Sequence, residues 1–151
     1  MYRHILVPVD GSATSVRALR EAIGLARQQA TELELVYVME DVLFLENEAY
    51  INYEEVQRSA RKGGERTLAQ AQALVRQAHM TAEERLLEAR GERIANVIIE
   101  EARRWPADLI VIGTHGRSGF SRILFGSVAE GVVRMAHVPV LLVRGGQELG
   151  R

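Results

Sequence analysis

The sequence predicts an α/β protein built on one open sheet of five parallel strands, with helices on both faces. Short apolar runs alternate along the chain with segments whose apolar residues recur at the spacing of an amphipathic helix. One such run, Leu109-Ile110-Val111-Ile112, is apolar throughout, which is typical of a buried parallel strand. The chain has 151 residues and no linker or internal repeat, so we expect a single domain over residues 1–151.

The N-terminal part of the chain is expected to form a strand, a helix and a second strand. The run 4–9 is apolar after its first residue and is followed by Asp10-Gly11, a turn signal. Ser12 then suits the N-cap of a helix, because its hydroxyl can accept a hydrogen bond from a first-turn N–H group. The next apolar run, residues 33–39, is the second strand. The apolar face of the helix comprises Val16, Leu19, Ile23 and Ala26.

A long amphipathic helix is expected over residues 54–78, followed by a weaker third strand over residues 84–89. Gly63 and Gly64 interrupt the helical pattern, and each weakens a helix by roughly 1 kcal/mol relative to alanine. We therefore expect a kink or break at this pair. Apolar or small residues repeat along one face of the helix at Val56, Ala60, Leu68, Ala71, Leu74, Val75 and Ala78.

The C-terminal half alternates in the same way. A third helix is expected to end near Trp105-Pro106 and to be followed by the strand over residues 109–112. A last helix is expected over residues 128–136 even though it contains Gly131. The fifth strand is expected to begin at Val138 and to end at Val143. The third helix has an apolar face made of Ile94, Val97, Ile98 and Ala102.

Right-handed crossovers and the adjacency of consecutive elements leave few topologies for such a sheet. The expected strand order is 3-2-1-4-5, which places a switch point between the first and fourth strands. Ligands of open α/β sheets bind at such a point, outside the carboxyl ends of the strands. The first strand ends there with Pro8, Val9 and Asp10, and the fourth is followed by Gly113 and Gly116. We expect both ends to form one crevice.

The segment between the fourth strand and the last helix is rich in glycine. Gly113 and Gly116 follow the strand, and Gly126 and Ser127 precede the helix. Without a Cβ, glycine lets backbone N–H groups close around a phosphate, and the positive end of the helix dipole favours an anion. The alternative is that these residues only turn the chain and start the helix. The spacing of the glycines and the serine favours the phosphate-binding interpretation.

The sequence lacks two other nucleotide-binding motifs. A P-loop needs Gly-x-x-x-x-Gly-Lys-Ser/Thr, and the only lysine in the chain, Lys62, is far from the glycines in sequence. No Gly-x-Gly-x-x-Gly follows the first strand, which argues against a dinucleotide site. His115 has no carboxylate partner that the sequence identifies. We therefore expect a protein that binds a nucleotide, with no catalytic residue and at most weak hydrolysis.

Charge and composition exclude several other classes. The 19 basic and 20 acidic residues nearly balance and no basic run stands out, so nucleic acid is not expected as a partner. The chain has no cysteine, which excludes disulfides and thiol catalysis and is compatible with the cytosol. The N-terminus enters a strand directly, and no apolar run approaches the about 18 residues of a membrane span. We expect a cytoplasmic protein with no membrane partner.

These features resemble the universal stress protein family along nearly the whole chain, from Ile5 to Val143. The resemblance implies an ATP-binding member that acts as a regulatory protein of the stress response. Its most specific part is the family pattern Gly-x-x-Gly, nine residues, then Gly-Ser/Thr, which is satisfied without a gap by Gly113, Gly116, Gly126 and Ser127.

The resemblance also implies roles for individual residues. Pro8, Val9 and Asp10 would line the adenosine pocket, and Val38 would meet the adenine. Asp10 would lie near the ribose or a metal-bound phosphate, and a carboxylate there suits Mg²⁺ bound together with ATP. His115 and Arg117 are assigned to the same site. The residues along the ribose and phosphates would be Gly113, Gly116, Gly126, Ser127 and Val128.

The fifth strand, from Val138 to Val143, lies at a sheet edge in the expected order. It is apolar and carries no protective lysine, so it invites pairing with another chain. The resemblance implies that two copies pair these strands antiparallel across a two-fold axis, which predicts a homodimer. The apolar segment 41–53 is expected to pack over the nucleotide, against a partner chain or on its own domain.

Three functions remain open on the sequence. The first is a dimeric switch or partner-binding module whose ATP occupancy sets its conformation or its choice of an unknown protein partner. The second is a slow ATPase or adenylate-forming enzyme, which the missing lysine disfavours. The third is an interaction module that binds AMP or cyclic AMP. The glycine pattern does not distinguish ATP from these ligands.

Overall fold

A computed structural model describes residues 1–41, 52–115 and 126–145 of the chain. Within them, five parallel strands form one sheet in the order β3-β2-β1-β4-β5, as the sequence predicts. The central pairing joins β1 to both β2 and β4, so the switch point lies between β1 and β4. The strands are β1 (His4–Pro8), β2 (Glu32–Met39), β3 (Glu83–Glu88), β4 (Leu109–Gly113) and β5 (Val140–Val143).

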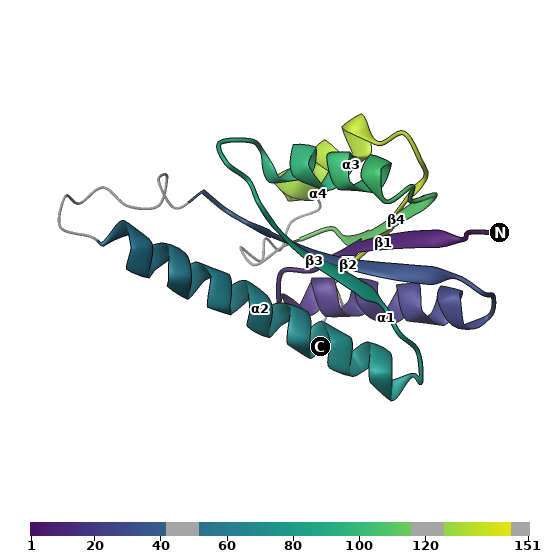
Figure 1. Ribbon diagram of the computed structural model, residues 1–151. Helices are drawn as coiled ribbons and strands as arrows, with labels where there is room; N and C mark the ends of the chain where they lie inside the picture. Colours follow the sequence, from purple (N-terminus) through teal and green to yellow (C-terminus); the bar gives the residue numbers. More distant parts are fainter. Residues whose placement is uncertain (42–51, 116–125, 146–151) are drawn as a thin grey trace, which may run out of the picture.

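Helices cover both faces of the sheet, which confirms the predicted fold class (Figure 1). Helices α1 (Ala13–Arg27) and α2 (Tyr53–Gln77) lie on one face, and α3 (Ile94–Arg104) and α4 (Ser127–Met135) lie on the other. The hydroxyl of Ser12 accepts a hydrogen bond from Ser15 N at 3.2 Å, so the predicted N-cap of α1 is confirmed.

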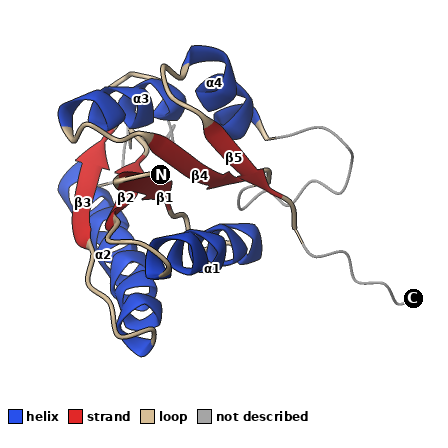
Figure 2. Ribbon diagram, turned by 90° about the vertical axis from the view of Figure 1, so that its right-hand side faces the viewer, coloured by secondary structure: helices blue, strands red, loops and turns tan. Residues whose placement is uncertain are grey.

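The sheet lies between two layers of helices (Figure 2). It separates two apolar cores because successive side chains of each strand point to opposite faces. Ile5 and Val7 face α1 and α2, whereas Leu6 faces α3 and α4. All three are at most 1% exposed, so β1 is buried on both sides, as in other doubly covered parallel sheets. The carboxyl ends of the central strands are thereby fixed between helices of both layers.

The predicted break in the long helix is wrong, because α2 runs from Tyr53 through Gly63 and Gly64 to Gln77 as one helix. Gly64 is buried against the sheet. A Cβ there would lie 2.8 Å from both Leu86 Cδ1 and Tyr37 Cδ1, closer than such atoms approach. Glycine therefore lets α2 lie close to β2 and β3 at this point, and packing offsets its low helix propensity.

The fifth strand is shorter than predicted, because it begins at Val140 rather than Val138. Pro139 has no N–H group and cannot donate to a strand neighbour, although its carbonyl accepts from Ile110 N at 3.1 Å. Other predicted element ends differ from the observed ends by one residue. Val9, for example, lies just beyond β1 but donates to Val36 O at 2.8 Å.

None of the helices in the described ranges combines the length and the apolar character that crossing a membrane requires.

Candidate functional site

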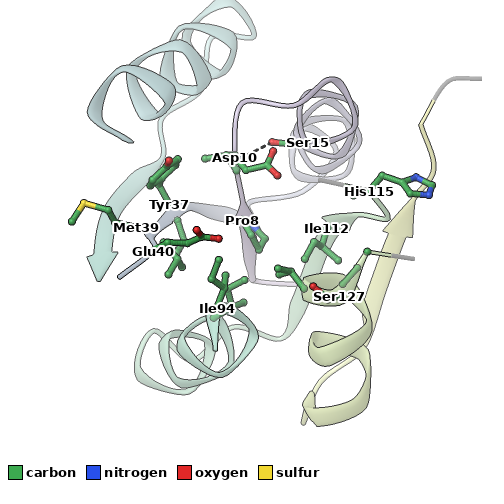
Figure 3. Close-up of a pocket in the computed structure, with 18 of the residues that line it drawn as sticks. Pro8, Asp10, Ser15, Tyr37, Met39, Glu40, Ile94, Ile112, His115 and Ser127 are labelled. Carbon is green, nitrogen blue, oxygen red and sulfur yellow. Dashed lines mark hydrogen bonds between the residues drawn. The ribbon is translucent and has the colours of Figure 1, made fainter. Parts of the chain in front are cut away.

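A cleft with a volume of about 570 Å³ opens at the carboxyl ends of β1, β2 and β4 (Figure 3). It lies at the predicted switch point, and α2, α3 and the N-terminus of α4 complete its walls. Figure 3 shows Asp10 and Ser15 on one side of it and Ile94 and Ser127 on the opposite side. Its volume is in the range of small-molecule sites, roughly 300–1,000 Å³.

Asp10 is held at the rim of the cleft by the turn between β1 and α1. Its carboxylate accepts a hydrogen bond from Ser12 N at 2.9 Å, and its own N–H group donates to Ser15 Oγ at 3.2 Å. Gly11 takes a φ of +86°, a left-handed conformation that glycine adopts without strain. The sequence Asp-Gly-Ser thus forms the turn and fixes the acidic side chain beside the cleft.

Gly113 has a packing role as well as a place in the cleft. A Cβ at this position would lie 3.0 Å from both Cβ and the carbonyl oxygen of Thr14, so a side chain here would require α1 to shift by a few tenths of an ångström. This packing contact is a reason for glycine at residue 113 that does not depend on a bound ligand. It does not explain Gly126, which lies at the opposite end of the loop.

Thr114 connects three elements around the cleft, and the sequence interpretation missed it. It is 6% exposed, its N–H group donates to Val143 O at 3.0 Å, and its carbonyl accepts from Gly126 N at 2.6 Å. Its hydroxyl lies 3.1 Å from Nδ1 of His115. Thr114 therefore ties the end of β4 to β5 and to the start of α4. In Figure 3 the ring of His115 points away from the centre of the cleft.

The N-terminus of α4 opens directly onto the cleft. Gly126 has φ −67° and ψ 162°, an extended conformation that any residue can adopt, so the backbone does not require glycine here. The first intrahelical bond is Glu130 N to Gly126 O at 3.0 Å, and the preceding N–H groups of the first turn have no acceptor within the helix. These N–H groups and the helix dipole make a site for an anion.

The opposite end of the cleft is mostly apolar and is formed by β2, α2 and α3. Val38, which the family resemblance assigned to the base, lies here with Met39 and Ile94. The sequence interpretation missed the contribution of α2, where Ser59, Ala60 and Gly63 line the cleft, and that of Glu40 after β2. These three residues of α2 are small and lie next to one another or about one turn apart, and this pattern could have indicated that α2 lines a cleft.

Most of the predicted site residues come together in this cleft. Two of them, Gly116 and Arg117, lie outside the described residues, as does most of the segment 41–53. Among the described residues, no group of three or more His, Cys, Asp or Glu side chains could hold a metal ion. The predicted residues that line the cleft are Pro8, Val9, Asp10, Val38, Gly113, His115, Gly126, Ser127 and Val128.

Comparison with known proteins finds similarity along nearly the whole chain. The model of the universal stress protein family matches residues 1–144. A universal stress protein of Methanocaldococcus jannaschii is 35% identical over 144 residues, which cover 95% of this chain and 83% of that protein.

Two solved structures resemble this one and contain nucleotides. A universal stress protein in complex with cyclic AMP has a TM-score of 0.71 at 26% identity, covering 96% of this chain and 99% of that one. The universal stress protein of Archaeoglobus fulgidus in complex with dAMP has a TM-score of 0.67 at 29% identity, covering 94% and 98%.

Proposed function

The chain belongs to the universal stress protein family, and from this premise we propose that it binds an adenine nucleotide in the cleft between β1 and β4. The phosphates bind at the N-terminus of α4, where first-turn N–H groups and the helix dipole favour negative charge. The base binds at the apolar end, between Val38 and Ile94. The observation that carries the proposal is that the N-terminus of α4 lines the cleft at the switch point.

ATP is the ligand that we propose for this site. The described cleft has one polar end for an anion and one apolar end for a base, and its acidic residue, Asp10, lies at the rim. The Asp10 carboxylate would accept hydrogen bonds from ribose hydroxyls or complete the coordination of Mg²⁺ held by phosphate oxygens. The relatives in complex with cyclic AMP and dAMP support the base and ribose part of this proposal.

We propose a regulatory role in the cytoplasm during stress, in which nucleotide occupancy is the signal that protein partners read. The cleft joins elements from both helical layers, so a bound nucleotide would change the packing of α4 against α3 and the sheet. Binding, and not turnover, is the activity assigned to Asp10, Gly126 and Ser127.

Mass spectrometry of small molecules released from the purified, denatured protein tests the proposal. ATP is the expected nucleotide, whereas AMP or cyclic AMP would favour the monophosphate alternative. If no nucleotide is released, calorimetric titration with ATP, AMP and cyclic AMP decides the matter. If the protein binds none of these three nucleotides, the proposed function is contradicted.

A further inference from the structure

A cluster of charged side chains around two buried carboxylates joins β2 to α3 beneath the cleft. Glu34 of β2 is 0% exposed and Glu101 of α3 is 4% exposed. Arg104 of α3 contacts both carboxylates, with Nη2 2.6 Å from Glu101 Oε2 and 3.4 Å from Glu34 Oε2. Its Nε also donates to Glu101 Oε1 at 2.9 Å, so the pair of Arg104 and Glu101 is bidentate.

Strand β3 contributes two more charges to this cluster. Arg85 Nη1 lies 3.9 Å from Glu101 Oε2. Glu83 is the register neighbour of Glu34, and its carboxylate accepts a hydrogen bond from Trp105 Nε1 at 3.0 Å. Both residues therefore face the α3 side of the sheet beside Glu34.

Strand β1 contributes His4, whose ring meets the Trp105 ring edge-on with centroids 5.1 Å apart. Its Nε2 lies 3.6 Å from Glu32 Oε1, at the solvent side of the cluster. When Glu34 holds a proton, four charged groups of β3 and α3 balance, and Glu32 lies outside them. The balanced groups are the cations Arg85 and Arg104 and the anions Glu83 and Glu101.

The chemistry of this cluster places one proton on Glu34. Burial, a hydrogen bond with Glu101 and the charge of Glu101 together raise the pKa of Glu34 to about 8. Burial alone would raise the pKa of Glu101, but hydrogen bonds with Arg104 and Glu34 and the charges of Arg85 and Arg104 lower it instead. Glu34 is therefore the neutral partner and Glu101 the anion.

The cluster lies on the same two elements that form one wall of the cleft. Val36 and Val38 follow Glu34 on the same side of β2, and both line the cleft. Ile94 and Ile98 lie about two turns and one turn before Glu101 on α3, and both also line it. The position of α3 relative to β2 thus sets the width of the apolar end.

We propose that Glu34, Glu101 and Arg104 form a latch that positions α3 against β2, and that the affinity of the cleft for nucleotide falls when the latch loses its proton. Loss of the proton leaves two buried carboxylates facing each other with one uncompensated negative charge, which separates α3 from β2. The three are positioning residues, since none of them lines the cleft. This inference rests on the proposed function.

Calorimetric titration with ATP between about pH 7 and pH 9.5 tests the coupling. We expect wild-type affinity to fall roughly fivefold or more across this range, a typical coupling between two sites. Glu34→Gln should keep its affinity, because the amide is neutral at every pH and can still donate to Glu101. Glu84→Gln, which changes an exposed carboxylate of β3, is the matched control and should behave as wild type.

Infrared spectroscopy provides a readout that needs no nucleotide. The difference spectrum between wild type and Glu34→Gln should contain the C=O band of a protonated carboxyl group at about pH 7. This band should fall to half its size near pH 8 and be lost by about pH 9.5. A missing band at pH 7 overturns the latch even if ATP binds well.

The two readouts separate the two proposals. If the band is present and ATP binds, but wild type and Glu34→Gln show the same pH profile, the coupling is overturned. If ATP binds at no pH, the proposed function is wrong, and the coupling is wrong with it. The infrared band then shows whether Glu34 is still protonated, so failure of nucleotide binding is distinguished from failure of the protonated carboxyl.

Discussion

Glu34 makes the stability of the fold depend on pH, whether or not a nucleotide binds. Its pKa of about 8 in the folded protein is well above the ordinary value of 4.5, so the folded state holds a proton that the unfolded chain releases. The resulting stabilisation is complete below about pH 4.5 and is lost as the pH rises toward 8. The pKa of Glu101 is lowered in the folded protein, so its contribution to stability is lost as the pH falls, and only at acidic pH.

Replacing Glu34 by glutamine should remove this dependence. The free energy of unfolding of the wild type should decline between about pH 5 and pH 8, by an amount on the order of a few kcal/mol. The decline should be much smaller in Glu34→Gln, and urea denaturation at a series of pH values measures both slopes. Parallel slopes would show that Glu34 is already ionised at neutral pH.

The sequence identified the residues of the candidate site better than it identified their roles. The positions of Gly113 and Gly126 were predicted, but the close contact that favours glycine at residue 113 comes from Thr14, about 100 residues away in sequence. Likewise, no local pattern indicates that Glu34, inside an apolar strand, meets Glu101. Roles set by distant contacts need the fold before they can be assigned.

At the scale of elements, the alternation of strands and helices was predictable because every strand and helix carries its own periodic signal. Two details were not. Low propensity at Gly63 and Gly64 predicted a break in α2, but tertiary packing overrides it. The wall that α2 contributes to the cleft depends on how the helix lies across β2, which periodicity does not specify.

Replacing a helical glycine by alanine should raise or lower the free energy of unfolding, depending on what the new Cβ would contact. A Cβ at Gly131 of α4 would lie 2.7 Å from Cβ of Ala95, and neither atom can rotate away. Gly131→Ala should therefore lower the free energy of unfolding by about 1–3 kcal/mol, as overpacking does.

The matched control is Gly24→Ala in α1, where a Cβ meets nothing within 4 Å. This variant should gain up to about 1 kcal/mol from helix propensity. Thermal or urea denaturation compares the two. If Gly131→Ala is as stable as Gly24→Ala, α3 and α4 do not approach each other as closely as the structure indicates.

For the molecule as a whole, we expect a homodimer formed through the edge of β5. Among the described strands, β5 pairs with β4 alone. Leu141 lies on the α1 side of β5 and is 37% exposed. Leu141→Asp should give a monomer by light scattering, because a two-fold contact buries the new charge twice. Leu142 is a poorer test, since it packs against the core under α3 and α4. A wild-type monomer at micromolar concentration would contradict the expected dimer.

The central claim is that a nucleotide phosphate binds at the N-terminus of α4, and Gly126→Val tests it most directly. The extended backbone at this position accepts valine, so the fold should persist while the branched side chain occupies the phosphate position. Calorimetric titration should show ATP affinity at least about tenfold below wild type, about 1.4 kcal/mol, with Gly24→Ala unchanged. Wild-type affinity in a folded Gly126→Val variant would contradict the claim.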